Sequence, residues 1–171
     1  SYWFIIGFFT LGHIFLRVEP RRAARFATSI MAMTCAGHAL YFLVPGYGPY
    51  QALAAEFHGP LPGGPVYELM MRVAAGGAQL DIFPSLHTAH TVFIALFCWR
   101  ESDAKIYRWL RWPASIAAAH IVAATLFLRW HYLIDIAAGF LVAYAAFKLA
   151  HVLNPWYERR RRAVGLAATW W

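Results

Sequence analysis

Residues 131–153 read HYLIDIAAGFLVAYAAFKLAHVL, and only Asp135 and Lys148 interrupt this apolar run with a charge. About twenty apolar residues are enough to cross the hydrocarbon core of a bilayer as an α-helix. Four more runs have the same character, at residues 2–16, 26–44, 84–99 and 112–128. The five runs together predict an all-α fold, a polytopic transmembrane helix bundle.

Composition supports this class, because 61% of the 171 residues are hydrophobic and only 13% are charged, outside the soluble globular range. The first run has no turn or basic flank before it, so we expect it to continue a longer helix, with a sixth helix upstream. We expect one integral-membrane domain over residues 1–171. Its catalytic core would cover about 40–153, and residues 154–171 would form a basic cytoplasmic tail.

The fifteen Lys and Arg residues are unevenly placed. Five alternating helices put three basic clusters on one side of the membrane: Arg17, Arg21, Arg22 and Arg25; Arg100, Lys105, Arg108 and Arg111; and Arg159 to Arg162. The positive-inside rule makes that side cytoplasmic. The net charge of +7 then favours anionic headgroups, and nothing resembles a groove-reading motif, so no nucleic-acid partner is expected. Only Arg72 and Arg129 fall on the non-cytoplasmic (periplasmic, lumenal or extracellular) side.

The long segment 45–83 lies on that same non-cytoplasmic side. It opens with PGYGPY at residues 45–50, a turn-forming run that cannot continue the preceding helix. Residues 65–75 predict a short interfacial helix, with Pro65 in its first turn and Glu68 early. The segment is either a lid over a substrate entrance or a plain connector packed on the bundle.

Two motifs carry candidate chemistry. Phe-Pro-Ser-Leu-His occupies residues 83–87, and Arg129-Trp-His131-Tyr-Leu-Ile-Asp135 follows about forty residues later. Both open membrane helices at one face, where free backbone N–H groups favour a phosphate. On a helix, His131 and Asp135 would be one turn apart, so the carboxylate would orient the imidazole. Ser85 would cap its helix or donate to phosphate, and Arg129 supplies a planar cationic donor.

These motifs resemble the second and third signature motifs of the type 2 phosphatidic acid phosphatase superfamily. The variant here, with Tyr132 after His131, is closer to the inositol phosphorylceramide synthase branch, and residues 44–50 also resemble a loop of that branch. The resemblance implies that His131 attacks phosphorus and becomes a phosphohistidine, and that Asp135 orients it. His87 would protonate the leaving alkoxide and then activate an acceptor. The implied mechanism needs no metal and no other cofactor.

The chain also departs from the superfamily's pattern. The first signature motif is absent, and the arginine and serine of the third motif would fall at Thr125 and Ala124. We expect Arg129 and Arg72 to replace these phosphate-binding groups, although Arg72 could equally be an interfacial anchor. Tyr132 is either a substrate contact or part of an aromatic belt.

The predicted function is transfer of a phospho-headgroup from a phospholipid to an alcohol acceptor, such as a ceramide- or lipid-type hydroxyl. Hydrolysis by the same residues is the alternative. Two other classes stay open: a metal site built from His87, His90, His131 and Asp135, and a transporter using intramembrane histidines.

Other polar residues within the apolar runs are expected to pack. His90 is expected to be a packing or supporting residue. Cys35 and Cys98 lie inside apolar runs, so both are expected to be buried packing residues.

Overall fold

The computed structural model describes residues 2–15, 18–59, 61, 63–75 and 80–167. Within these residues the regular structure is helical and no strand occurs, which confirms the all-α prediction. The elements are α1 (Tyr2–Phe15), α2 (Pro20–Leu43), α3 (Pro49–Ala52), a 3-10 turn η1 (Ala54–Glu56), α4 (Pro65–Ala75), α5 (Leu86–Arg100), α6 (Lys105–Phe127) and α7 (Leu133–Ala163).

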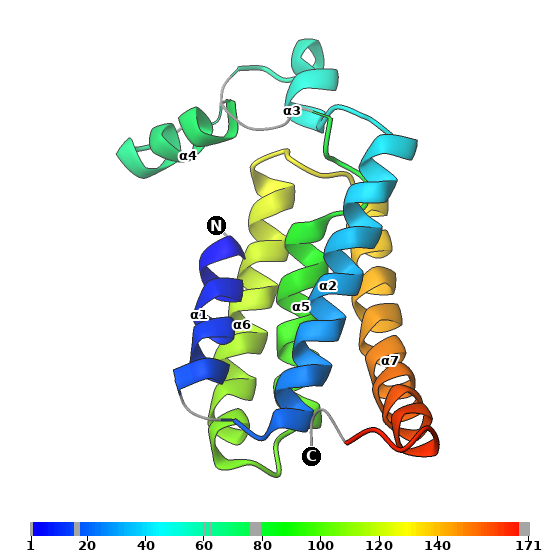
Figure 1. Ribbon diagram of the computed structural model, residues 1–171. Coiled ribbons are helices and arrows are strands. Elements are labelled where there is room, and N and C mark those ends of the chain that lie inside the picture. Colours follow the sequence, from blue (N-terminus) through cyan, green and yellow to red (C-terminus); the bar gives the residue numbers. More distant parts are fainter. Residues whose placement is uncertain (1, 16–17, 60, 62, 76–79, 168–171) are drawn as a thin grey trace.

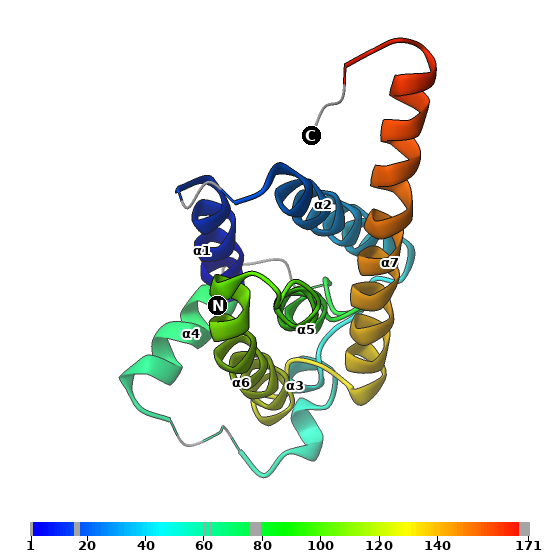
Figure 2. The same cartoon turned by 90° about the horizontal axis from the view of Figure 1, so that it is seen from below.

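Helix α5 is the centre of the bundle. It packs against α1, α2, α6 and α7, and the view along the bundle places it between them (Figure 2). A helix that is apolar on all sides is stable only when neighbours cover every face. Phe93, Phe97 and Ile94 are accordingly almost completely buried. The core therefore forms around α5, whose N-terminus also carries the Phe-Pro-Ser-Leu-His motif of residues 83–87.

Three helices, α2, α6 and α7, are long and apolar enough to cross a membrane. Their outer faces expose large apolar side chains, for example Phe42 (88%), Phe127 (78%) and Leu141 (71%), which suits contact with lipid. Helix α5 has only 15 residues, or about 22 Å of helix. It tolerates this length because the other four helices enclose it.

The helices extend further than predicted at the end of the bundle that carries the basic clusters. Helix α2 begins at Pro20, α6 begins at Lys105, and α7 continues to Ala163, so the predicted boundaries at residues 26, 112 and 153 are wrong. Charged residues ended the apolar runs, but a helix continues through them wherever its backbone hydrogen bonds are kept. The segment 154–163, expected as a basic tail, is thus the last part of α7.

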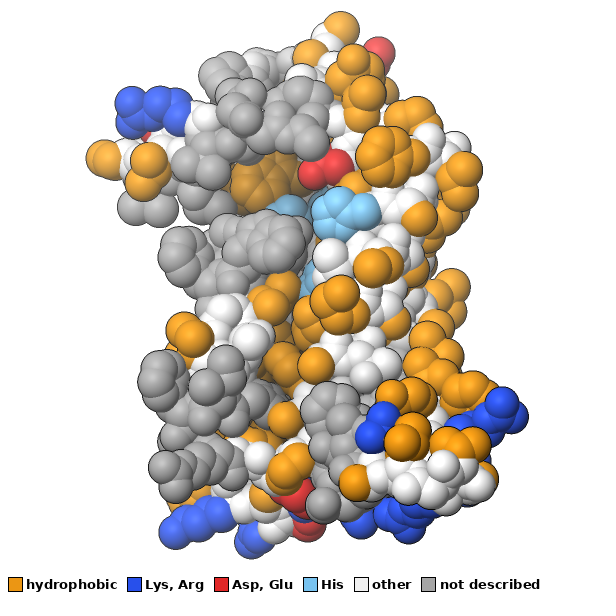
Figure 3. All heavy atoms as spheres, viewed as in Figure 1, with side chains coloured by type: hydrophobic (Ala, Val, Ile, Leu, Met, Phe, Trp, Pro, Cys, Tyr) orange, Lys and Arg blue, Asp and Glu red, His pale blue; other side chains and the backbone are white. Residues whose placement is uncertain are grey.

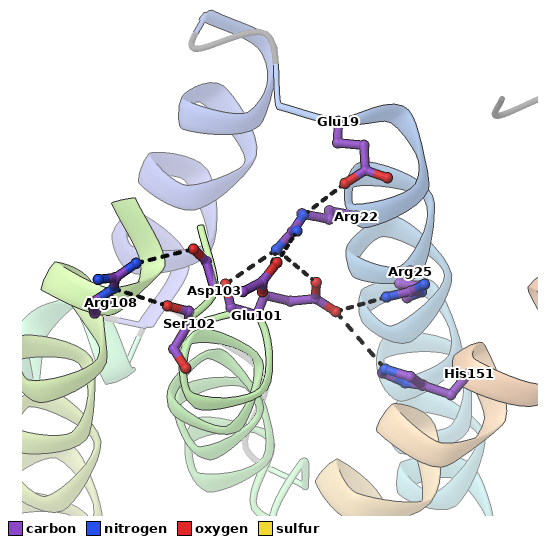
Figure 4. A network of polar contacts seen from close by, with 8 residues as sticks. All are labelled: Glu19, Arg22, Arg25, Glu101, Ser102, Asp103, Arg108 and His151. Carbon is purple, nitrogen blue, oxygen red and sulfur yellow. Dashed lines mark hydrogen bonds and ion pairs between the residues drawn. The ribbon is translucent and has the colours of Figure 1, made fainter. Parts of the chain in front are cut away.

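A polar network accounts for part of this extension (Figure 4). The Glu101 side chain, 6% exposed, accepts from Arg25 at 2.9 Å and pairs with Arg22 at 3.0 Å. Arg22 also donates to Asp103 at 2.9 Å and to Glu19 at 2.9 Å. The Arg22 guanidinium lowers the pKa of the Asp103 carboxyl to about 2. The network ties the start of α2 to the turn between α5 and α6.

The opposite end of the bundle is covered by the described residues 44–59, 61, 63–75 and 80–85 (Figure 1). Helices α3 and α4 lie across it, with α4 near the ends of α1 and α6 (Figure 1). The bounds of α4 confirm the predicted helix at 65–75, whereas the one-turn α3 was not predicted. Lys and Arg side chains gather at the other end, and histidines are visible near this one (Figure 3). The structure thus separates the basic clusters from both motifs.

Candidate active site

The two motif histidines face each other across the starts of α5 and α7. His87 Nδ1 lies 3.3 Å from His131 Nε2, and the ring centroids are 5.5 Å apart. His87 lies in the first turn of α5 and is half-buried, while His131 is 4% exposed. Residues 44 positions apart in the chain therefore form one imidazole pair.

His131 lies outside the helix that was predicted to begin with it, because α7 begins at Leu133. The connection from α6 holds it instead. The N–H groups of Trp130 and His131 both donate to the Thr125 carbonyl, at 2.9 and 3.3 Å. The nucleophile candidate is thus fixed by its backbone against the end of α6, at the position where the resemblance would put an arginine.

Asp135 stands behind His131 on the side away from His87. Its Oδ2 atom lies 3.6 Å from His131 Nδ1 and accepts the Tyr132 N–H at 2.8 Å. Both side chains are 3% exposed. His131 Nδ1 has no hydrogen-bond partner among the described residues, and 3.6 Å is beyond ordinary hydrogen-bond reach. A small approach of the two groups would fix the imidazole with Nδ1 protonated and Nε2 directed at His87.

Ser85 joins the two helix starts. It is the N-cap of α5, as predicted, and its hydroxyl accepts from the Thr88 N–H at 3.3 Å. Its own N–H donates to the Asp135 carbonyl at 3.0 Å. A Cβ on Gly139 would lie 2.6 Å from the Ser85 carbonyl oxygen, so only glycine allows this approach. The backbone contact between Ser85 and Asp135 sets the spacing of the two histidines.

Arg129 lies beside the site but engages the covering segment. Its φ is 58°, a left-handed conformation that is uncommon outside glycine and often found at functional sites. Its guanidinium stacks 3.8 Å from the Phe57 ring centroid and donates to the Gly59 carbonyl at 3.3 Å. Its carbonyl accepts the Tyr50 N–H at 2.8 Å. Phosphate binding by Arg129 stays a prediction that requires these side-chain contacts to open.

Trp130 lies in the candidate site, although the motif analysis assigned it no role. Its ring lies 5.7 Å from the His87 ring. Its Nε1 atom is buried, with no hydrogen-bond partner among the described residues. A buried indole N–H normally has an acceptor, so this donor is available to a substrate oxygen. Its position next to His131 in the sequence was the only signal.

A family model described as the PAP2 superfamily matches residues 1–149. The chain belongs to the PAP2 superfamily. Searches of curated proteins and of solved structures gave no match. PAP2 membership supports lipid chemistry of the phosphatase or phosphotransferase type, carried out by an enzyme, in a fold whose helices can span a membrane.

Within this PAP2 fold, the remaining predicted substrate residues are more peripheral. Arg72 is exposed on α4, which lies near α1 and α6 rather than near α7 (Figures 1 and 2). Tyr132 is half-buried at the N-cap of α7, next to His131. Neither substrate contact is tested by the geometry, and both stay predictions.

His90 and the cysteines show how the polar residues of the spans are used. His90 is fully buried; its Nδ1 lies 2.9 Å from the Leu86 carbonyl and its Nε2 lies 3.1 Å from Thr34 Oγ1. It is a packing residue between α2 and α5, as predicted. Cys98 is buried as expected, but Cys35 is exposed; that part of the prediction is wrong, because Cys35 lies on an outer face of α2.

Proposed function

We propose that this PAP2 protein is a lipid phosphotransferase that acts through a phosphohistidine at His131. The observation that carries the proposal is the order of three side chains. His87 faces His131 Nε2 at 3.3 Å, and Asp135 lies 3.6 Å from the other ring nitrogen. A nucleophile needs one free nitrogen and a partner that fixes its tautomer, and a general acid must lie near the leaving group.

In the first step, His131 Nε2 attacks the phosphorus of a phospholipid. The P–N bond forms as the P–O bond to the diacylglycerol oxygen breaks, and His87 gives its proton to that oxygen. Asp135 stabilises the positive charge that develops on the His131 ring. The headgroup and its phosphorus then remain on His131.

In the second step, the acceptor hydroxyl gives its proton to His87 and its oxygen attacks phosphorus. The P–N bond breaks, which regenerates His131 and releases a new phospholipid. A ceramide- or lipid-type alcohol is the proposed acceptor, in keeping with the resemblance to the inositol phosphorylceramide synthase branch. Water in the same place would give hydrolysis, which is the alternative outcome of the same chemistry.

Substrate binding has to separate the two imidazole rings, because His87 Nδ1 lies against His131 Nε2, the nitrogen atom that must attack phosphorus. We propose that the phosphoryl group enters between the two rings. The phosphoryl oxygens would then accept hydrogen bonds from the Trp130 N–H, which has no other acceptor among the described residues. They would also bind the Arg129 guanidinium once it leaves Phe57 and Gly59. Ser85, which is fully buried, would contribute chiefly by holding His87 in place.

The PAP2 site is proposed to face the non-cytoplasmic side. The basic clusters lie at the opposite end of the bundle (Figure 3), and the positive-inside rule assigns that end to the cytoplasm. A cysteine placed at Gly63, which is exposed on the covering segment, tests this orientation in a Cys35→Ala background. Protection of that cysteine from an impermeant thiol reagent added outside would contradict the proposal.

The metal-site alternative is less well supported. It needs His90 beside His87, His131 and Asp135, but both His90 nitrogens already face protein oxygens in the α2–α5 contact. Metal analysis of the purified protein distinguishes the two functions.

Reconstituted protein supplied with a phospholipid labelled at phosphorus and with a ceramide acceptor tests the transfer directly. A new labelled phospholipid indicates transfer, and a free labelled phospho-headgroup indicates hydrolysis. Rapid quenching should also trap label on the protein in an acid-labile form, which His131→Ala should abolish. His38→Ala is the matched control, because His38 is exposed on α2 and its Nδ1 atom lies 2.7 Å from the Thr34 carbonyl of the same helix. Unlabelled protein with full turnover would refute the phosphohistidine.

A further inference from the structure

An apolar cavity of about 290 Å³ lies between α1, α5 and α6. Phe8 and Phe9 contribute one wall, and Ala114, Ala117 and Ala118 on α6 contribute another. Small side chains on α6 therefore leave the space that larger ones would fill. The volume is about twice that of a ~150 Å³ apolar cavity that stays dry and binds benzene.

The cavity lies on the same face of α5 as the imidazole pair. Its α5 wall is made by Thr91 and Ile94, four and seven residues after His87, which are positions that share one helical face. At about 1.5 Å per residue, Thr91 lies about 6 Å and Ile94 about 10 Å below His87 along α5. Substrate held at His87 would therefore have this space below it on the same face of α5, towards the middle of the bundle.

The cavity has little to offer a polar ligand. Thr91 is the one hydroxyl among its lining residues, and that hydroxyl already donates to the His87 carbonyl at 2.7 Å. A water molecule needs two or more polar partners to remain in such a place. Hydrocarbon is the chemical class that fits the lining, and a phospholipid is the molecule that joins hydrocarbon to a phosphate at this distance.

We propose that the cavity holds an acyl chain of the phospholipid whose phosphorus is placed between His87 and His131. The identity of this ligand rests on the proposed function. An acyl chain gains no hydrophobic free energy by moving from the bilayer into the cavity, because lipid tails are as apolar as the cavity walls. The cavity selects by shape instead, because a chain bound in it fixes the depth and direction of the phosphate.

Filling the cavity should therefore misplace the substrate. Ala117→Phe puts an aromatic ring into it, whereas Ala119→Phe puts the same ring on the exposed face of α6 and serves as the matched control. We expect Ala117→Phe to lower kcat/KM for a long-chain phospholipid by about tenfold or more, and to spare a short-chain analogue. Leu110→Ala, which enlarges the cavity, should improve turnover of a branched-chain phospholipid.

Photolabelling separates this inference from the chemistry. A phospholipid with a diazirine in the middle of one acyl chain is cross-linked to the reconstituted protein, both wild type and His131→Ala, and labelled peptides are identified. We expect label on α1, α5 and α6 in both proteins, lost in Ala117→Phe and kept in Ala119→Phe. Unlabelled phospholipid should compete with it better than diacylglycerol.

The proposal would be overturned by label elsewhere in the protein or by label that Ala117→Phe leaves unchanged. Equal competition by diacylglycerol would also overturn it, because the cavity would then hold a structural lipid rather than the substrate. Label as expected in a protein that shows no phosphoryl transfer would support the acyl-chain site and count against the proposed function. Phosphoryl transfer by a protein that is labelled elsewhere would support the proposed function and count against the acyl-chain site.

Discussion

Replacing Asp135 separates the structural role of its carboxylate from its chemical role. In Asp135→Asn the side-chain oxygen can still accept the Tyr132 N–H, now 2.8 Å from Oδ2. The negative charge behind His131 is lost, and the new amide N–H₂ favours a ring with Nδ1 unprotonated. The proton would then occupy Nε2, the atom that has to attack.

The distance sets the size of the effect. His131 Nδ1 and Asp135 Oδ2 are 3.6 Å apart and nearly excluded from solvent. Two unit charges about 4 Å apart interact by about 4 kcal/mol at an effective dielectric constant of about 20. Because both charges are delocalised, about 3–4 kcal/mol of stabilisation of the charged ring is at stake, or about 10²–10³ in rate.

Single-turnover formation of the phosphohistidine measures this loss, and the thermal midpoint of the solubilised protein measures folding. Asp135→Asn should lose rate and keep its midpoint. Asp135→Ala should lose rate and also about 1 kcal/mol of stability, because the Tyr132 N–H loses its acceptor. An asparagine variant that forms the intermediate at the wild-type rate would refute the assigned role of the carboxylate.

Three further predictions follow from the site and the polar network. Arg129→Lys should lower the rate by about 10²–10³, because lysine loses the planar fork, and more than Arg72→Lys does; equal losses would put Arg72 on the phosphate as well. Trp130→Phe, which removes the buried N–H together with one of the two fused rings, should lower kcat/KM by about tenfold, and an unchanged value would exclude a bond to substrate. Glu101→Ala should reduce the free energy of unfolding by about 1.5–3 kcal/mol, because Arg22 and Arg25 both lose their bonds to a buried carboxylate while Arg22 keeps Asp103 and Glu19; thermal unfolding in detergent checks this, and an unchanged midpoint would contradict it.

Apolar runs and charge placement were enough to predict the five helices of the bundle and the end of it that holds the motifs. The predicted helix boundaries were wrong where charged residues were taken to mark the end of a helix. Arg22 and Arg25 lie within α2 because Glu101, in a different part of the chain, accepts their hydrogen bonds. A pairing between residues 76 positions apart leaves no periodicity in the sequence.

The motifs identified the residues of the candidate site, but these residues lie close together for a different reason from the one that the sequence predicted. The i, i+4 spacing predicted His131 and Asp135 on one helix, whereas His131 precedes α7 and is held by the Thr125 carbonyl. The left-handed backbone of Arg129 redirects its side chain to Phe57, and nothing in the identity of an arginine signals that turn. Gly139, four residues after Asp135, was an unused hint of a close helix approach.

The hydrogen bond from the Ser85 N–H to the Asp135 carbonyl has a consequence for how such a protein can diversify. The two histidines of the candidate site are spaced by main chain, which any sequence supplies, and by the absence of a side chain at Gly139. Among the residues that the structure describes, those between 44 and 84 and those lining the apolar cavity do not contribute to this backbone contact. Selection can therefore remodel the residues proposed to recognise headgroup and tail, while the contact that spaces the two histidines is inherited unchanged.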